Sequence, residues 1–321
     1  MGELSRYFHL HARCGPFIAS EQWPGFAGNL WASGYHPVCP PGHVRRVARL
    51  LPGFADLSEP RWIRSGESKG TMRIAIISDI HANLPALEAV LADIDQVGTD
   101  RIYCLGDVIG YGPEPRECLQ ASVRFDVNLL GNHEEAVLYD PIGFNPRAKA
   151  AVEWTKQQLM NTSLPREENA ALWKHLASMK QTHEEGDIFL AHGTPRDPTR
   201  EYLFVQDCSD DPAKVEELFD SFGPSTAFVG HTHVAGIFTP GPRFRTPEEL
   251  GGKITLGLEN SIVNVGSVGQ PRDGDPRSSY VIVDQNELEF RRVAYSVEET
   301  QRRFKRTPLP ENLALRLIEG R

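Results

Sequence analysis

The sequence predicts an α/β protein, because three short apolar segments alternate with two amphipathic ones. Residues 73–78 (RIAIIS) are rich in β-branched side chains, as a buried strand is. Similar segments follow at 101–105 and 125–130. Helical patterns at 84–97 and 113–122 separate these strands, and the second has Pro at its start. The β-α-β-α-β order predicts a mostly parallel sheet with helical crossovers.

The rest of this region continues with helices and then with strands. Helices are predicted at 145–160 and 165–179, and strands at 187–191 and 226–230. From Ala235 onward the pattern consists of short strands between Gly- and Pro-rich turns, which is typical of antiparallel or mixed pairing. The C-terminal segment predicts two short polar helices.

Residues 1–71 differ in character from the rest of the chain. Three tryptophans are scattered among Gly, Pro and Arg, and helical or strand periodicity lasts for only one short stretch. We expect an irregular N-terminal extension over 1–71 and one domain over 72–321. A sharper hypothesis is that translation begins at Met72. Residues 67–70 can be encoded by purine-rich codons that resemble a ribosome-binding site, and Met72 opens directly into the first strand.

Composition restricts the possible partners. The formal net charge is -9, which argues against a dedicated nucleic-acid-binding surface. A small phosphate-bearing substrate stays compatible with this charge, because a bound metal can reverse the local field. No apolar run approaches membrane-spanning length. The five cysteines are widely spaced and odd in number, so we expect reduced thiols and a cytoplasmic protein.

Side chains that can bind a metal follow five of the predicted strands. In order, they are Asp79 and His81, Asp107, Asn132 with His133, His192, and His231 with His233. Ligands of open α/β sheets bind beyond the carboxyl ends of the strands, so we expect these clusters to converge. In an extended chain residues i and i+2 point the same way, so the Asp-x-His and His-x-His pairs can each grip one region. One such residue alone is usually a turn or cap residue. Five such clusters in order, each made only of Asp, Asn or His, indicate a metal centre.

The ligand types narrow the choice of metal. Imidazole, carboxylate and amide oxygen together suit Mn or Fe first, with Zn or Mg as alternatives. Seven candidate ligands are too many for one ion. They suit two divalent ions about 3.5–4 Å apart, the spacing found in two-metal hydrolases.

The ordered motifs D-x-H, G-D, G-N-H, H and G-H-x-H, between residues 79 and 233, resemble those of the calcineurin-like metallophosphoesterase superfamily. Within it, the chain is most similar to the small bacterial phosphodiesterase-like members. The resemblance covers about 250 residues from Met72. It implies a four-layer α/β/β/α sandwich of two mixed β-sheets flanked by helices. It also implies a metal-dependent phosphoric ester hydrolase, with a phosphodiesterase of small esters as the leading expectation.

The resemblance also implies roles for individual residues. The ligands would be Asp79, His81 and His233 for one ion, Asn132, His192 and His231 for the other, and Asp107 bridging both. A hydroxide bridging the two ions would be the nucleophile. Asn132 is also expected at the substrate. His133 would be a general acid or a transition-state stabiliser, the alternative being a histidine that only supports the ligands or lies at the surface.

Two departures from the superfamily pattern bear on the substrate. Its protein phosphatases carry G-D-x-V-D-R-G and R-G-N-H-E, whereas residues 106–112 here read GDVIGYG and residues 129–134 read LLGNHE. The phosphate-binding arginines of those enzymes are therefore missing at both places. This disfavours a protein phosphatase, and equally a symmetrical dinucleotide tetraphosphatase.

Other residues could contact a substrate. Arg272 lies in the Gly-rich segment 264–275 and could pair with a phosphate, the alternative being a solvated arginine in a turn. Tyr111 follows the Asp107 motif, where packing is the favoured role. Two alternatives to the phosphodiesterase remain: a protein or nucleotide phosphomonoesterase, and a non-catalytic partner-binding scaffold. A scaffold is disfavoured because every ligand position and His133 are intact.

Overall fold

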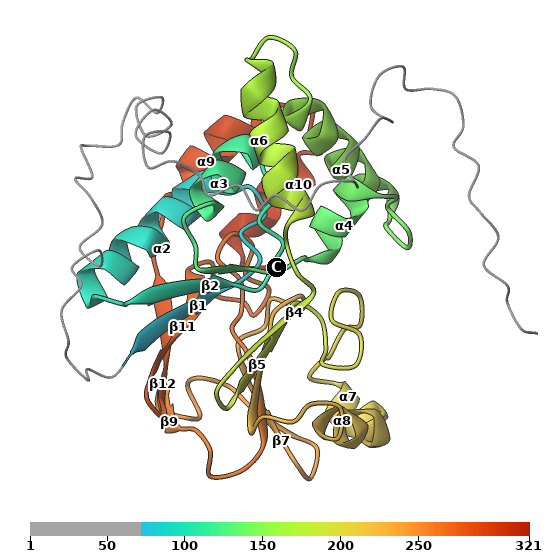
Figure 1. Cartoon of the computed structure of the whole chain (residues 1–321). Coiled ribbons are helices and arrows are strands. Elements are labelled where there is room, and N and C mark those ends of the chain that lie inside the picture. Colours follow the sequence, from blue (N-terminus) through green and yellow to red (C-terminus); the bar gives the residue numbers. More distant parts are fainter. Residues whose placement is uncertain (1–71) are drawn as a thin grey trace, which may run out of the picture. The chain divides into compact units, whose positions relative to one another are not determined.

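The computed structural model describes residues 72–321, and two six-stranded β-sheets form its centre (Figure 1). The strands of the first sheet are β1 (Arg73–Ile77), β2 (Arg101–Cys104), β3 (Val127–Asn128), β9 (Lys253–Thr255), β11 (Ser278–Asp284) and β12 (Glu287–Val293). Their order is β3-β2-β1-β11-β12-β9. The expected extension over 1–71 lies outside the described residues.

The first sheet is mixed. β1, β2 and β3 are parallel, as the β-α-β-α-β pattern predicted, with Ile76 opposite Tyr103. β11 lies antiparallel to β1, with Arg73 opposite Asp284, and β12 and β9 continue antiparallel. β3 has two residues instead of the six predicted at 125–130, and the next residue, Leu129, forms an isolated bridge with Lys180.

The second sheet is also mixed. Its strands are β4 (Thr182–Glu185), β5 (Ile188–Ala191), β6 (Thr226–Val229), β7 (Gly236–Thr239), β8 (Arg243–Arg245) and β10 (Ser261–Asn264). Their order is β4-β5-β6-β10-β7-β8. β5, β6 and β10 are parallel, β4 and β7 are antiparallel to them, and β8 pairs antiparallel with β7. The three parallel strands are central in the second sheet, whereas in the first sheet they form one half, from the edge strand β3 to β1.

Helices cover the outer faces of both sheets. They are α2 (Leu84–Val97), α3 (Pro115–Ser122), α4 (Asn132–Leu138), α5 (Pro146–Leu159), α6 (Arg166–Ala177), α7 (Asp207–Asp210), α8 (Pro212–Phe219), α9 (Val297–Phe304), α10 (Asn312–Leu315) and the 3-10 turn η2 (Arg316–Ile318). Figure 1 shows α7 and α8 on the opposite side of the molecule from α2–α6. The layers are thus α/β/β/α, as expected.

Three buried clusters hold these layers together. Between the sheets, Ile76 and Tyr103 pack with Phe228 and Val263. A second cluster joins the outer face of the first sheet to α2, α3, α5 and α6. A third joins the second sheet to α8. Burying apolar area on both faces of each sheet is what allows the parallel strands to be almost wholly apolar.

The predicted helices are present, with small changes at their ends, but three others were missed. α3 begins at Pro115 instead of residue 113, and α5 and α6 lie within 145–160 and 165–179. α4, α7 and α8 were not predicted. α8 has a clear start signal, because Pro212 occupies the first turn and Asp211 accepts a hydrogen bond from the Lys214 amide at 3.2 Å.

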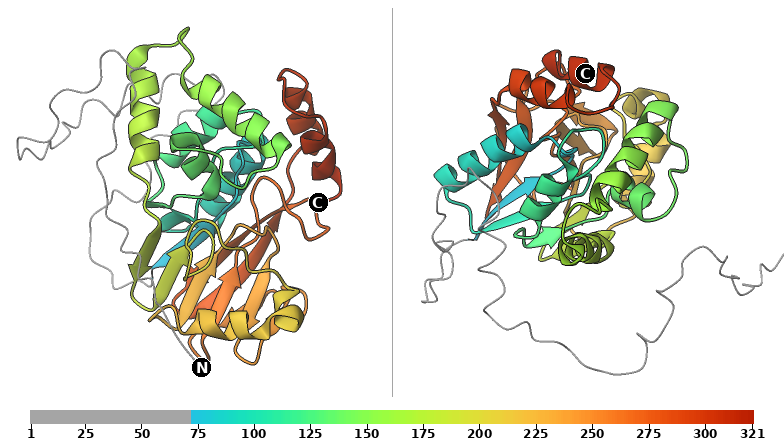
Figure 2. Two further views of the ribbon diagram at one scale, coloured as in Figure 1. Left: turned by 90° about the vertical axis from the view of Figure 1, so that its right-hand side faces the viewer. Right: turned by 90° about the horizontal axis from the view of Figure 1, so that it is seen from above.

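The C-terminal segment lies on the same side of the sheets as α2–α6 (Figure 2). Thr300 of α9 donates to the Asn83 side chain at 2.9 Å, and Arg303 pairs with Glu114 at 2.5 Å. Residues of this segment form a fourth apolar cluster with Ala151 of α5 and with Trp154 and Tyr111. These contacts fix the segment beside the loops that follow β1 and β2.

Candidate metal centre

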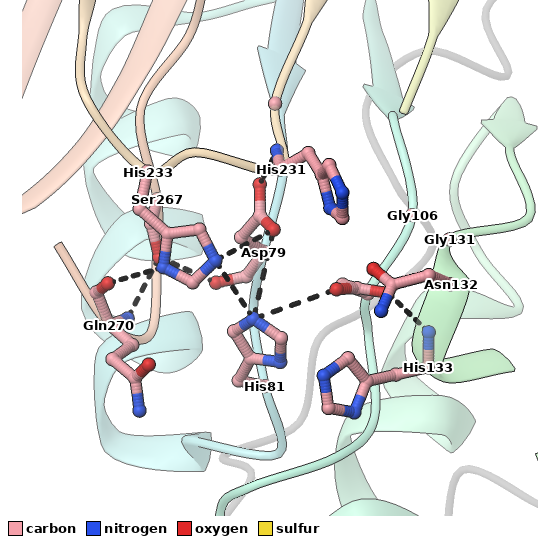
Figure 3. A network of polar contacts seen from close by, with 12 residues as sticks. Asp79, His81, Gly106, Gly131, Asn132, His133, His231, His233, Ser267 and Gln270 are labelled. Carbon is pink, nitrogen blue, oxygen red and sulfur yellow. Dashed lines mark hydrogen bonds and ion pairs between the residues drawn. The ribbon is translucent and has the colours of Figure 1, made fainter. Parts of the chain in front are cut away.

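The predicted ligands lie together where strands of both sheets end (Figure 3). Asp79 and His81 follow β1, Asp107 follows β2, His192 follows β5, and His231 and His233 follow β6. These six side chains are buried. Asn132, the first residue of α4, is half-buried. The site therefore lies across the seam between the two sheets.

One group of ligand atoms forms around Asp79. Nε2 of His233 lies 3.1 Å from Oδ1 of Asp79 and 3.1 Å from Nε2 of His81. Nε2 of His81 is in turn 3.7 Å from Oδ1 of Asp79 and 3.7 Å from Oδ2 of Asp107. Figure 3 shows Asp79, His81 and His233 turned toward one another.

A second group forms around His192. Its Nε2 lies 3.1 Å from Oδ1 of Asn132, 2.9 Å from Nδ1 of His231 and 3.4 Å from Oδ2 of Asp107. The same Asp107 oxygen also faces the first group, through His81. A single carboxylate oxygen therefore lies between the two groups.

Backbone carbonyls set the tautomers of three of these histidines. Nδ1 of His81 donates to the Ile109 carbonyl at 3.3 Å, and Nδ1 of His233 donates to the Gln270 carbonyl at 2.5 Å. In a neutral imidazole only one nitrogen carries a proton, so both Nε2 atoms present lone pairs. Two lone pairs 3.1 Å apart cannot hydrogen-bond each other. A cation between them would satisfy both.

A backbone carbonyl also orients His231, but it binds the other ring nitrogen. Its Nε2 donates to the Arg200 carbonyl at 3.2 Å, which leaves the Nδ1 lone pair facing His192. Such outer hydrogen bonds are usual for metal-binding histidines, because they fix the ring and raise its basicity.

The backbone conformation at the ligands differs from the extended chain that was expected for the two ligand pairs. The Asp-x-His and His-x-His pairs do converge, but they are not extended. Five ligand residues have left-handed backbone, with φ of 55° at Asp79, 48° at His81, 52° at Asp107, 66° at His231 and 64° at His233. Non-glycine residues rarely adopt this conformation, and such strain is typical of functional sites. Tight turns, and not strand periodicity, bring the paired side chains together.

Glu134 is a buried residue whose role the sequence analysis missed. Its carboxylate accepts hydrogen bonds from the amides of Asp107 at 2.7 Å, Gly131 at 2.9 Å and Ile109 at 3.0 Å. Gly131 is required for close approach, because a Cβ there would lie 2.1 Å from Oδ1 of Asp107. The loop that carries Asp107 is therefore fastened to the start of α4.

His133 lies next to the ligand groups. Its amide donates to Oδ1 of Asp107 at 2.9 Å, and its ring packs against Tyr111 and Phe144, with ring centroids 4.4 and 4.9 Å away. Burial lowers the pKa of His133 to about 4. Tyr111 also packs against His81, at 4.7 Å, so it both packs and lines the site.

Arg272 lies beside this aromatic group. Its guanidinium is 5.9 Å from the centroid of the Tyr111 ring, and Nη2 donates to the Gln270 side chain at 2.8 Å. The structure thus brings Arg272 to the same region as His133 and Tyr111.

An aromatic stack beside His231 was also missed. The Tyr202 ring lies on the His231 ring, with centroids 3.6 Å apart, and Phe204 stacks on Tyr202 at 5.1 Å. Both Tyr202 and Phe204 are exposed. No sequence pattern marks this loop, because its role depends on where it folds.

The charges of the site are consistent with metal binding. Burial lowers the pKa values of His81 and His233, and that of His231 to about 3, so these rings are neutral near pH 7. For His192, burial opposes the charge, but Asp107 outweighs it and raises the pKa to about 9. A metal at His192 would displace this proton, since a ligating imidazole must be deprotonated there.

The residues present fit two divalent ions. Asp79, His81 and His233 form one compact group, and Asp107, His192 and His231 form another. Within the described residues, the buried Oδ1 of Asp79 has no hydrogen-bond partner. Imidazole, carboxylate and amide donors are those that Mn, Fe and Zn accept.

Comparison with known proteins identifies the superfamily of this chain. The sequence model of the calcineurin-like phosphoesterase superfamily domain matches residues 72–287. The chain belongs to this superfamily. Its members are metal-dependent phosphoesterases, so membership implies phosphoric ester hydrolase activity.

Relatives cover almost the whole described region. An uncharacterized protein of Methanocaldococcus jannaschii is 37% identical over an alignment of 261 residues, which covers 77% of this chain and 98% of that protein. A metallophosphoesterase from Sphaerobacter thermophilus, whose crystal structure is known, is 36% identical in sequence and has a TM-score of 0.63. The match covers 78% of this chain and 100% of that chain. A hypothetical protein from Pyrococcus horikoshii shares the fold at 19% identity and a TM-score of 0.60, covering 78% of this chain and 99% of its own.

Among residues 72–321, no helix has both the length and the apolar character needed to cross a bilayer.

Proposed function

We propose that this chain is a dinuclear metal-dependent phosphoesterase that hydrolyses a small phosphate ester, with diesters as the favoured substrates. The observation that carries the proposal is Oδ2 of Asp107, which faces His81 at 3.7 Å and His192 at 3.4 Å. A carboxylate oxygen placed between two groups of ligands suits a bridge between two ions.

The candidate ligands would form two metal positions. Asp79, His81 and His233 would hold one ion, Asn132, His192 and His231 the other, and Asp107 both. Mn or Fe fits this donor set first, with Zn or Mg as alternatives. When bound, the two ions would lower the pKa of water toward neutrality and offset the charge of the phosphate.

The protein's own groups would position and stabilise the reacting atoms. Carbonyls of Ile109, Gln270 and Arg200 keep the ligand lone pairs aimed inward. His133, beside Asn132 and Asp107, would act on the leaving group as a general acid or as a transition-state stabiliser. Asn132 and Arg272 would contact the substrate phosphate.

One observation favours a second candidate, a phosphomonoesterase. Arg272 places a positive charge beside the site, over Tyr111. A monoester carries more negative charge than a diester and would gain more from it. The missing arginines at 106–112 and 129–134 favour the diester instead.

A cytoplasmic location belongs to the same proposal. Cys104, Cys118 and Cys208, the cysteines within the described residues, are all free thiols. Free thiols suit a reducing compartment.

The test compares bis-p-nitrophenyl phosphate with p-nitrophenyl phosphate, using the full chain with Mn, Fe, Zn or Mg, or with EDTA. Asp107→Asn removes the bridging charge. Asp140→Asn is the matched control, since Asp140 is exposed and belongs to neither group of ligand side chains. We expect metal-dependent diester turnover that Asp107→Asn abolishes and Asp140→Asn keeps.

The other outcomes are equally informative. Turnover of the monoester alone would favour the phosphomonoesterase. Two bound ions per chain with no turnover of either ester would favour a partner-binding scaffold. Absence of any bound metal would refute the proposal.

A further inference from the structure

The His133 ring lies against the backbone of the loop that follows β2. A Cβ added at Gly110 would lie 2.1 Å from Nδ1 of His133 and 2.7 Å from its Cγ. The ring therefore occupies the space that any other side chain at position 110 would need. Gly110 also has a φ of 89°, which residues with a Cβ rarely adopt. The loop requires glycine here both for this backbone conformation and for the close approach of the ring.

A buried nitrogen of the His133 ring makes no hydrogen bond. Within the described part of the chain, Nδ1 of His133 has no hydrogen-bond partner. The rings of His81, His231 and His233 differ, because a backbone carbonyl accepts a hydrogen bond from each of them. Nδ1 of His133 contributes nothing of this kind to the orientation of its ring, so packing has to orient it.

Three rings enclose His133 at edge-to-face angles. Their centroids lie 4.4 Å (Tyr111), 4.9 Å (His81) and 4.9 Å (Phe144) from the centroid of the His133 ring. Edge-to-face contacts are favourable between aromatic rings. Tyr111 packs on the apolar cluster of the C-terminal segment, and Phe144 packs on the cluster that joins the first sheet to its helices. The rings around His133 are thus anchored in separate parts of the domain.

This enclosure holds His133 beside the candidate metal centre. One of its ring nitrogens lies within 4.8 Å of a ring nitrogen of His81 and of a carboxylate oxygen of Asp107. Figure 3 shows the His133 ring next to His81. Because the Gly110 backbone and three rings surround it, the His133 ring has little room to turn away from the ligands.

Two departures from the protein-phosphatase motif create this arrangement. G-D-x-V-D-R-G has Asp and Arg where this chain has Gly110 and Tyr111. An Asp at position 110 has no room here, since its Cβ alone would approach Nδ1 of His133 to 2.1 Å. Tyr111 in turn supplies the ring with the 4.4 Å contact to His133. The loop after β2 therefore gives His133 a steric support in place of a carboxylate.

We propose that Gly110 is a positioning residue for His133. The space that it leaves, together with the rings of Tyr111 and Phe144, fixes by shape the imidazole that would act on the leaving group. This rests on the proposed function, because it assumes that His133 acts on a phosphate ester. General acid–base catalysis is worth about a hundredfold or more, and a displacement of about 1 Å can lose a similar factor.

The first test measures the contact without turnover. Thermal unfolding of the full chain with Mn compares Gly110→Ala in the wild type and in His133→Ala. We expect Gly110→Ala to lower Tm by about 5 °C in the wild type, because the new Cβ and the ring cannot share one space. The loss should be much smaller in His133→Ala, where the ring is absent. Equal losses in the two backgrounds would show that this contact does not constrain the ring.

The matched control for backbone strain is Gly98→Ala. Gly98 ends α2 with a φ of 76°, and no atom lies within 4 Å of a Cβ added there. This variant carries a left-handed alanine without the contact to His133. Its Tm loss should be the same in the wild type and in His133→Ala, and its diester turnover should equal that of the wild type.

Kinetics with bis-p-nitrophenyl phosphate then test the positioning role. We expect Gly110→Ala to lower kcat about a hundredfold, with KM and the number of bound ions unchanged. In His133→Ala the same change should lower kcat no further, because the group that Gly110 positions is already absent. A role only in the structure of the loop would lower kcat again in that background and would reduce the bound metal.

A second variant removes a ring and adds no atom. Phe144→Ala should lower kcat about tenfold in the wild type and have no further effect in His133→Ala. Ile142→Ala is its control, since Ile142 is exposed and two residues away. This pair keeps the inference testable if Gly110→Ala does not fold.

The failure of this inference is separable from that of the proposed function. Diester turnover by the wild type with kcat unchanged in His133→Ala, or in both Gly110→Ala and Phe144→Ala, overturns the inference and leaves the proposed function standing. Absence of turnover in the wild type overturns the proposed function, and the inference with it.

Discussion

Glu134 contributes no ligand atom, yet it fixes two of the loops that do. Its carboxylate accepts three backbone amides, from Asp107, Ile109 and Gly131. Ile109 also supplies the carbonyl that orients His81. One buried side chain therefore positions the bridging carboxylate and, indirectly, a ligand of the first group.

We expect Glu134→Gln to destabilise the fold by about 1–3 kcal/mol, the usual cost of leaving a buried polar group poorly matched. The new amide NH2 would face a backbone N–H donor in place of an acceptor. Urea unfolding at pH 7.5 measures the change. Glu88→Gln, an exposed change on α2, should stay within about 0.5 kcal/mol of the wild type. Equal unfolding midpoints for both variants would contradict this role.

The helices are held to the sheets by a few polar links as well as by apolar packing. Asp93 of α2 accepts hydrogen bonds from Tyr280 of β11 at 2.6 Å and from Arg291 of β12 at 2.9 Å. Burial opposes ionisation of Asp93, but these two partners outweigh it and lower its pKa. The charged carboxylate is thus favoured in the folded protein.

This link makes a pH-dependent contribution to stability. Because the folded pKa is below the unfolded value of about 3.9, the stabilisation is present above that pH and is lost as the pH falls through the folded pKa. We expect Asp93→Asn to lower stability by about 1 kcal/mol at pH 7.5, and by less at pH 3.5. Urea unfolding in EDTA at both pH values measures this. Asp95→Asn, exposed on the same helix, should show no such trend, and a constant difference for Asp93→Asn would refute the link.

Sequence periodicity predicted the elements that carry the site, and it failed where tertiary contacts decide. β1, β2, β5 and β6 were predicted because each is a short apolar run that ends in a ligand. The left-handed turns at the ligands were not predicted, because glycine is the only residue type that signals a positive φ in a sequence. Glu134 and Tyr202 could not be assigned either, because their partners are distant in sequence. α8 could have been found from Asp211 and Pro212.

At the scale of the whole molecule, the candidate metal centre lies between two sheets that also meet through apolar packing and through the Arg101–Glu185 ion pair. The first ligand group combines Asp79 of the first sheet with His233 of the second. Asp107 of the first sheet meets His192 of the second. Ions bound here would therefore link the sheets only in the folded state.

We expect metal removal to lower Tm measurably. An ion at a hundred times its Kd stabilises the folded state by about 2.7 kcal/mol. For a domain of this size that corresponds to roughly 5–10 °C. Calorimetry with Mn and with EDTA measures the shift. Asp107→Asn should lose most of it, and an unchanged Tm in the wild type would show that the ions do not join the sheets.

The proposed start of the domain at Met72 leads to a prediction about the whole chain. The superfamily model begins at residue 72, and β1 begins at Arg73. We expect a chain starting at Met72 to keep the Tm and diester turnover of the full chain. N-terminal sequencing of protein made from the native gene tests the start itself, and a product beginning near Met1 would refute it.

The order of the ligands along the chain has a consequence for biosynthesis. His81 and His233, which share the first group, are 152 residues apart, as are Asp79 and His231. Neither group is complete until the loop after β6 has left the exit tunnel. A nascent chain thus carries Asp79 and His81 through 152 further residues of synthesis before His231 and His233 are present. Under the proposed function, insertion of the ions would therefore be a late event, because each group of side chains is completed only by His231 or His233.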